Sequence, residues 1–135
     1  MAQKKVRKHF MMINQISGLV IEHSVRIHKQ YRPGLFESVY EEIFCYEWNK
    51  SGISYLRHQP VPLVHEQIKL QAGFRVDLII DNQVLLEFKS TEGLSEVHFK
   101  QVLIYLKLTH LKLGLVINFN VALMKQGIFR LANNL

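Results

Sequence analysis

Asp77, Glu87 and Lys89, in the middle of the chain, are residue types that could do chemistry together. Glu87 and Lys89 flank Phe88 in the stretch VLLEFKS, and alternate side chains of a strand point to the same face. Carboxylates bind hard cations such as Mg²⁺ through oxygen. Such a cation polarises a phosphoryl group and activates water, and a nearby lysine offsets developing charge. The pattern therefore suits metal-dependent phosphodiester hydrolysis, although a surface ion pair at a strand end would look the same.

The turn before this strand decides whether Asp77 can join the other two residues. A three-residue stretch separates the predicted strands 74–80 and 84–89. A two-residue turn within it would pair Asp77 with Leu86, and Glu87 would then face away. A three-residue turn would pair Asp77 with Glu87 and bring their carboxylates to one face. The metal-site hypothesis therefore predicts an odd-numbered turn or a bulge in this hairpin.

A predicted helix over residues 96–110 adds polar side chains after the strand. Gln101 and Tyr105 are four residues apart, and His98 precedes Gln101 by three, so all three lie on one helix face. They could line a site at the edge of the sheet. They could equally form a half-buried helix face whose hydroxyl and amide groups are satisfied elsewhere.

Another predicted helix, over residues 35–50, is rich in acids. Glu37 is followed three places later by Tyr40, whereas Glu41 is expected to point elsewhere on the helix. A solvated acidic face is the default interpretation of such a run.

The rest of the pattern predicts a mixed α/β sheet with helices packed on it. The expected order is α-α-β-β-β-α-β, with one further strand at the end, in a single domain that spans residues 1–135. Pro60 lacks an amide donor and should mark an edge or a bend. The remaining predicted segments are a helix over 4–29, one strand ribbon that Pro60 divides into 54–59 and 61–66, and strands over 113–119 and 128–131.

The composition is that of a folded domain without a membrane span. Of the 135 residues, 48% are hydrophobic, which is enough to bury a core. No apolar run reaches the roughly 18 residues that a membrane span needs, and no signal-peptide cleavage site follows the basic start. The single cysteine, Cys45, is expected to be a small buried side chain in a reducing cytoplasm.

The net charge of +6 is unevenly distributed. Residues 1–36 contain seven Lys or Arg and one Glu, whereas residues 37–96 contain five basic and ten acidic residues. Residues 97–135 contain five basic residues and no acid. Acids between basic flanks would suit a polyanionic substrate held around a metal ion. An ordinary solvated basic surface would give the same counts.

Several segments, taken in order, resemble a known family. GLFESVY at residues 34–40 is similar to the motif that names the GxxExxY protein family. Asp77 with EFK at 87–89 resembles the core of the PD-(D/E)XK nuclease superfamily, and QVLIY at 101–105 resembles the motif of its RecB-type branch. The likeness extends over about residues 13–131. His28 stands where family members carry a histidine, and Arg32 departs from the family's Gly-Pro-Gly turn.

The resemblance implies a restriction-endonuclease-like fold and roles for individual residues. Asp77 and Glu87 would bind Mg²⁺ or Mn²⁺, with the Phe88 carbonyl as a third ligand. Glu37 would help to position the metal or its water, and Lys89 would be the catalytic lysine. Gln101 and Tyr105 would steady the site. The expected nucleic-acid contacts are Arg75, Lys100 and Tyr105.

The implied activity is hydrolysis of DNA, or of RNA, with weak or structure-directed specificity. A homodimer would place two such sites on two strands. Two alternatives remain open from the sequence: a nucleic-acid-binding module without catalysis, which the basic flanks would also suit, and a protein-interaction domain that retains the nuclease fold.

Overall fold

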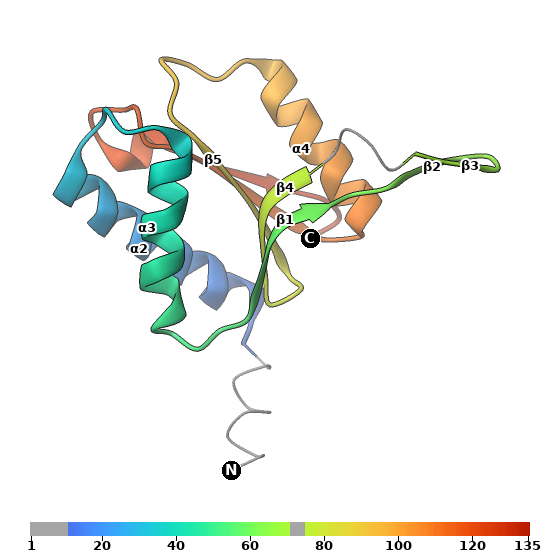
Figure 1. Cartoon of the computed structure of the whole chain (residues 1–135), viewed down its shortest axis with the longest axis horizontal. Helices are drawn as coiled ribbons and strands as arrows, with labels where there is room; N and C mark the ends of the chain where they lie inside the picture. Colours follow the sequence, from blue (N-terminus) through green and yellow to red (C-terminus); the bar gives the residue numbers. More distant parts are fainter. Residues whose placement is uncertain (1–10, 71–74) are drawn as a thin grey trace, which may run out of the picture.

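The computed structural model describes residues 11–70 and 75–135 (Figure 1). Residues 4–10 of the first predicted helix, and Phe74 of a predicted strand, lie outside the described residues. Within them, no helix is long and apolar enough to cross a membrane. The elements are α2 (Ile13–Tyr31), α3 (Glu37–Asn49), β1 (Tyr55–Pro60), β2 (Leu63–His65), β3 (Ile68–Leu70), β4 (Arg75–Ile80), β5 (Val84–Lys89), α4 (Glu96–Thr109), β6 (Leu113–Asn118), η1 (Met124–Gly127) and β7 (Ile128–Ala132).

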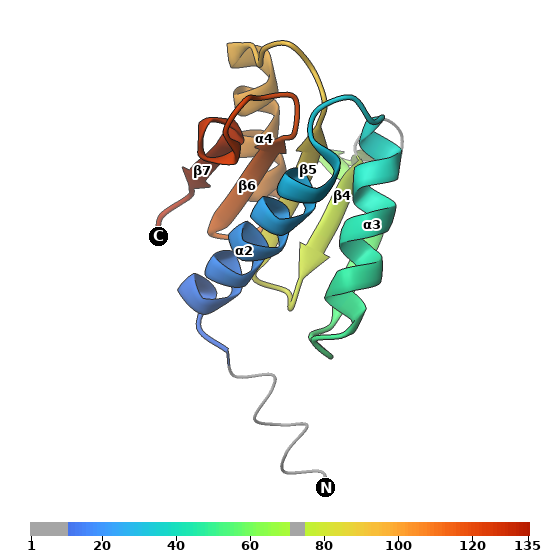
Figure 2. The ribbon, with the colours of Figure 1, turned by 90° about the vertical axis from the view of Figure 1, so that its left-hand side faces the viewer.

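Five strands form one mixed sheet in the order β1-β4-β5-β6-β7. β5 and β6 are parallel, and the other neighbouring strands are antiparallel. A parallel pair needs a crossover connection, which α4 supplies between β5 and β6. Figure 2 shows α2 and α3 on one face of the sheet and α4 on the other. The predicted mixed sheet flanked by helices is confirmed.

Each face of the sheet has its own apolar core. β6 is buried along its whole length, as its continuous apolar run predicts for a strand covered on both faces. The core under α2 and α3 is rich in aromatic side chains that are at most 1% exposed: Tyr40, Phe44, Trp48, Phe88 and Phe119. The core under α4 contains Leu85, Val102, Leu106 and Val116. The sheet is therefore packed against apolar side chains on both faces.

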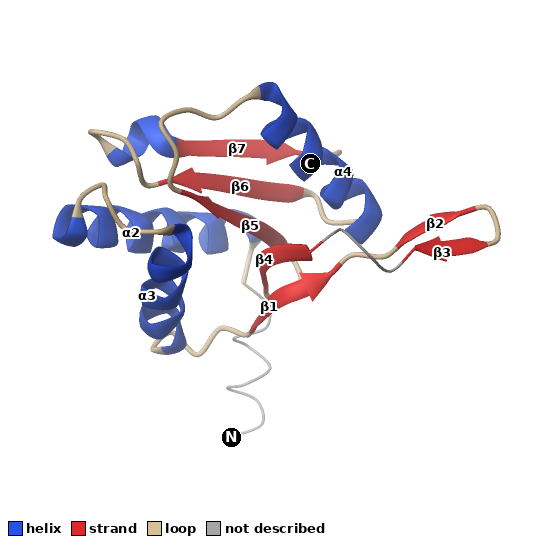
Figure 3. Cartoon of the chain, turned by 45° about the horizontal axis from the view of Figure 1, so that its top comes forward, coloured by secondary structure: helices blue, strands red, loops and turns tan. Residues whose placement is uncertain are grey.

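β2 and β3 form a separate hairpin that projects beyond β1 (Figures 1 and 3). The sequence predicted a strand over residues 61–66, within which β2 lies, but not β3. Each of these strands has three residues, and Val64, Ile68 and Leu70 are exposed, so no buried face gives β3 a pattern. Pro60 ends β1, which is an edge strand of the main sheet, as the missing amide donor predicts.

The turn between β4 and β5 has the odd length that the metal-site hypothesis requires. Ile80 pairs with Val84, and the Gln83 N–H donates to the Ile80 carbonyl at 2.9 Å. Asp81 and Asn82 have φ values of 52° and 55°. These two residue types tolerate the left-handed region better than most others do. The local sequence is compatible with this three-residue turn, and of the two registers that the sequence left open the structure has the one that the metal-site hypothesis requires.

Candidate active site

Asp77 lies where β4 and β5 separate. The backbone pairing ends at Leu78 and Leu86, and the next position in the same register places Asp77 opposite Glu87. There the Asp77 carboxylate accepts a hydrogen bond from the Phe88 backbone N–H at 2.8 Å. The Asp77 side chain thus replaces a backbone hydrogen bond at the end of the β4–β5 pair. This position brings the carboxylates of Asp77 and Glu87 together.

Glu87 is a buried acid beside a second acid. Only 7% of the residue is exposed. Burial, followed by the charge and the hydrogen bond of Asp77, raises the pKa of Glu87 to about 9, and the positive charge of Lys89 opposes this shift. One lysine therefore does not compensate for the charge of two neighbouring carboxylates, and a bound cation would do so.

A second group of ligand atoms meets at the same aspartate. One atom each from Glu41, His58 and Asp77 lies within 4.8 Å of the others. Glu41 is only 5% exposed, and its Oε2 accepts a hydrogen bond from Arg57 Nε at 2.6 Å. His58 Nε2 lies 2.6 Å from the same oxygen. The sequence analysis expected Glu41 to point away from the site. On the contrary, it is the acid of α3 that lies beside Asp77 in this group.

His58 was missed by the sequence analysis because its backbone is irregular. Neighbouring residues of a strand normally point to opposite faces, yet both Arg57 and His58 reach Glu41. His58 has a φ of 54°, in the left-handed region, which breaks the alternation of β1. It lies opposite Asp77, between the pairs that Arg57 and Gln59 make with β4. No spacing in the sequence signals this departure.

Glu37 and Lys89 lie at the end of β5. Glu37 Oε2 accepts a hydrogen bond from the Ser90 N–H at 3.3 Å, directly after Lys89 in the chain. Glu37 and Glu41 are four residues apart and share one face of α3. Glu37 is thus near the site, but it is not in the group formed by Glu41, His58 and Asp77. Lys89 is half-buried, and its carbonyl accepts from the Phe119 N–H at 2.9 Å.

The comparison with protein families agrees with this geometry. A family model described as the PD-(D/E)XK nuclease superfamily matches residues 14–131. The chain belongs to the PD-(D/E)XK nuclease superfamily. No curated protein and no solved structure matches the chain. The mixed sheet with helices on both faces is consistent with the restriction-endonuclease-like fold of this superfamily.

The donor set of this PD-(D/E)XK protein fits a divalent cation. Asp77 and the E-F-K run at residues 87–89 match the pattern in the superfamily's name, with Val76 in place of the proline. Carboxylate oxygens suit Mg²⁺ and Mn²⁺, and the imidazole of His58 is also a good ligand for transition metals. The positions of Glu41 and His58 beside Asp77 enlarge the set of possible ligands.

The α4 side of the PD-(D/E)XK site holds Tyr105. This residue is only 5% exposed, a position that suits support of the site, and its expected contact with nucleic acid stays a prediction. Burial and then the charges of Glu87 and Asp77 raise the pKa of Tyr105, and Gln101 opposes the shift through a side-chain hydrogen bond. His98 lies in the first turn of α4, where its Nδ1 accepts a hydrogen bond from the Ser95 N–H at 3.1 Å.

The two basic residues expected to contact nucleic acid are both exposed. Arg75 is the first residue of β4, two before Asp77. Lys100 lies on α4, 3.9 Å from Glu96. Exposure leaves both available to a substrate, and their proposed role is unchanged.

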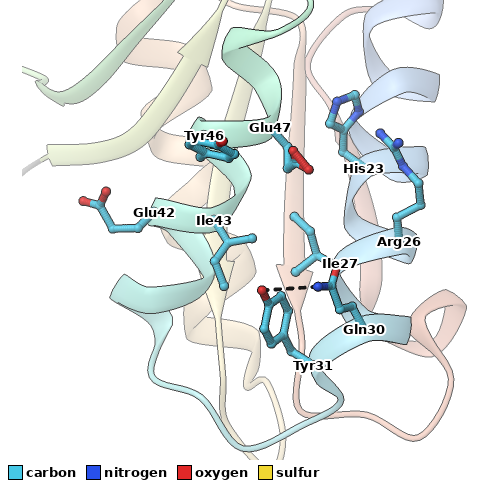
Figure 4. Close-up of a pocket in the computed structure, with 9 residues that line it drawn as sticks. All are labelled: His23, Arg26, Ile27, Gln30, Tyr31, Glu42, Ile43, Tyr46 and Glu47. Carbon is cyan, nitrogen blue, oxygen red and sulfur yellow. Dashed lines mark hydrogen bonds between the residues drawn. The ribbon is translucent and has the colours of Figure 1, made fainter.

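A cavity of about 500 Å³ lies between α2 and α3, apart from this site (Figure 4). Neither Asp77 nor Glu87 lines it. Its walls are formed by His23, Arg26, Ile27, Gln30, Tyr31, Glu42, Ile43, Tyr46 and Glu47. Membership of the PD-(D/E)XK superfamily assigns no ligand to this cavity.

Proposed function

We propose that this protein is a metal-dependent nuclease that hydrolyses phosphodiester bonds in DNA with Mg²⁺ or Mn²⁺. We place it in the GxxExxY family on the basis of GLFESVY at residues 34–40. The observation that carries the proposal is the position of Asp77, which lies beside Glu87 on one side and beside Glu41 and His58 on the other. Superfamily membership supports the same chemistry.

The acids would hold the cation. Asp77 and Glu87 are the principal proposed ligands, with the Phe88 carbonyl as a third. Glu41 and His58 lie close enough to Asp77 to complete the shell, and Glu37 would act through water. When bound, a divalent cation would polarise the phosphoryl group and lower the pKa of a water molecule.

The remaining polar residues would act on the substrate or on the ligands. The Lys89 ammonium would orient the attacking water and offset the negative charge that develops on the phosphate. Tyr105 and Gln101 would keep the two acids in place from the α4 side. Arg75 and Lys100 would contact the nucleic-acid backbone through charge, which gives affinity without sequence preference.

Cleavage assays with substituted proteins test this function. Wild-type protein should cut plasmid and single-stranded DNA in Mg²⁺ or Mn²⁺ and not in EDTA. Asp77→Asn and Lys89→Ala should each lower the cleavage rate at least a hundredfold, because each removes a ligand or a charge needed in the transition state. An RNA substrate of the same sequence, assayed in parallel, decides between DNA and RNA.

Two matched variants control for loss of charge as such. Asp81→Asn removes an acid from the β4–β5 turn at a position where asparagine tolerates the positive φ. Lys50→Ala removes an exposed lysine from the end of α3. Both should cleave like the wild type. Equal cleavage rates for the wild type, Asp77→Asn and Lys89→Ala would contradict the proposal.

A further inference from the structure

Arg32, the residue that follows α2, has a backbone conformation that suits glycine. Its φ is 61° and its ψ is 179°, a region that residues with a Cβ occupy only under strain. Hydrogen bonds hold it there: the Arg32 N–H donates to the His28 carbonyl at 2.8 Å, and the Arg32 carbonyl accepts from the Tyr40 hydroxyl. Pro33 also favours the extended ψ. Since glycine would fit without strain, the arginine side chain should contribute something that offsets it.

The Arg32 side chain lines a pocket of about 280 Å³ between the end of α2 and residues 122–124. Lys29 and His28 line the same pocket, and no Asp or Glu does. The His28 Nε2–H donates to the Val121 carbonyl at 2.7 Å, which ties α2 to the segment after β6. Throughout 11–70 and 75–135, no acid forms an ion pair with Lys29 or Arg32. The pocket therefore presents two unpaired cations beside a fixed wall.

The helix dipole does not account for Arg32. Basic residues are favoured at the C-terminal end of a helix, and Lys29, in the last turn of α2, fits that explanation. For Arg32, the free energy gained by one exposed charge near a helix end is smaller than the free-energy cost of holding a non-glycine residue in this backbone conformation. A ligand for the guanidinium is the better explanation.

The pocket is at the same end of the sheet as the candidate active site. β5 and β6 both finish there, beside the α2–α3 connection and η1 (Figures 2 and 3). The Ser90 hydroxyl, directly after Lys89, donates to the Leu35 carbonyl at 2.8 Å. Leu35 is three residues from Arg32, which is about 10 Å of chain at most. With about 3.4 Å of axial rise per nucleotide, that span corresponds to a few nucleotides.

We propose that Arg32 and Lys29 bind a phosphate of the nucleic-acid strand a few nucleotides from the bond that is cut. This proposal rests on the proposed function, since it assigns the pocket to the same strand. The guanidinium can donate two parallel hydrogen bonds to one phosphate, and Lys29 adds a second charge. His28 acts as a positioning residue, because its bond to Val121 holds the opposite wall in place.

The Arg32→Gly variant tests the proposal because stability and binding should change in opposite senses. Relief of strain should raise the Tm by about 2 °C or more. This net rise already allows for the destabilising effect of glycine, which gives the unfolded chain more conformational freedom. Loss of the guanidinium should weaken binding to a single-stranded DNA oligonucleotide about three- to tenfold. It should also reduce the slope of log Kd against log salt concentration by about 0.7. Fluorescence anisotropy in EDTA measures this affinity without cleavage.

Two further variants separate a charge effect from a fold effect. Lys29→Gln should weaken DNA binding by a similar factor without the rise in Tm. Lys50→Gln removes one charge at the end of α3 and should bind DNA like the wild type. Both proteins keep the strained Arg32 backbone, so their Tm values should stay near that of the wild type.

The outcomes for binding and for cleavage are independent. Wild-type DNA affinity in both Arg32→Gly and Lys29→Gln would overturn the phosphate site even where cleavage depends on Asp77. Loss of affinity in both variants supports the site even where no divalent ion produces cleavage, a result that rejects only the proposed nuclease activity. Binding of inorganic phosphate that depends on Arg32, with DNA affinity unchanged, would assign the pocket to a free anion and overturn the proposal.

Discussion

The Asp77 carboxylate accepts a hydrogen bond from the Phe88 N–H at 2.8 Å. Backbone pairing between β4 and β5 has ended one residue earlier, so this side chain closes the strand end in place of a carbonyl. The same carboxylate is a neighbour of Glu87 and of Glu41. Asp77 thus has a structural and a chemical role, and substitutions can separate the two.

Asp77→Asn and Asp77→Ala should differ in stability and agree in activity. Asparagine keeps an oxygen that can accept from the Phe88 N–H, whereas alanine leaves this buried donor without a partner. The free energy of unfolding, from urea titrations, should be near wild type for Asp77→Asn and about 1–3 kcal/mol lower for Asp77→Ala. Both variants should fail to cleave DNA. Equal loss of stability in the two would show that the Phe88 bond is unimportant.

The stability of the metal-free protein should depend on Glu87 between about pH 4.5 and pH 9. The pKa of Glu87 is raised from 4.5 to about 9 in the folded chain, first by burial. In this window the folded state binds more protons than the unfolded state, so the free energy of unfolding falls as pH rises. Glu87→Gln has no carboxyl to ionise, so its stability should not fall across this window and should exceed that of the wild type at pH 8. Urea titrations in EDTA at pH 5 and pH 8 measure this, and the same pH dependence in both proteins would contradict it.

His58→Asn should weaken Mn²⁺ binding more than Mg²⁺ binding. Asparagine tolerates the positive φ of His58, so the strand should keep its shape. Loss of an imidazole ligand should raise the Kd for Mn²⁺ about tenfold or more, and Mg²⁺, which prefers oxygen, should respond less. Electron paramagnetic resonance for Mn²⁺ and calorimetry for Mg²⁺ measure the two constants.

The matched control for that comparison is His65→Asn in β2, because His65 is exposed on the projecting hairpin. It should bind both ions like the wild type. Unchanged Mn²⁺ affinity in His58→Asn would remove His58 from the proposed ligands.

Tyr105→Phe should slow cleavage about tenfold with little change in Tm. The ring is buried in the core under α4 and remains in the variant, whereas the hydroxyl, whose pKa Glu87 and Asp77 help to raise, is lost. As a positioning residue, Tyr105 should affect kcat and leave DNA affinity in EDTA unchanged. Tyr46→Phe, on an exposed ring of α3, serves as the control. Weaker DNA binding by Tyr105→Phe would instead support the direct contact that the sequence suggested.

The parts of the site that depend on local sequence were predictable. The metal-site hypothesis required a three-residue turn between β4 and β5, and Asp81 and Asn82 accept the left-handed region that this turn uses. That register alone places Asp77 opposite Glu87. Strong apolar runs likewise predicted β5 and β6. The ends of both strands agree with the prediction to within one residue.

The parts that depend on a broken pattern were not predictable. His58 reaches Glu41 because its φ of 54° departs from strand geometry, and alternation would have placed it on the other face. Glu41 is buried at 5% exposure by contacts with β1, which no helical spacing reveals. β3 has three exposed residues and too little pattern to be recognised. Tertiary contacts decide each of these cases.

A crystal soaked in Mn²⁺ tests the proposed metal centre most directly. Anomalous difference density should show an ion coordinated by Asp77 together with Glu87, and its remaining protein ligands should come from the Phe88 carbonyl, Glu41 or His58. Soaked crystals of Asp77→Asn should show no ion there. An ion bound away from Asp77, or no ion at saturating Mn²⁺ in the wild type, would contradict the metal-dependent mechanism.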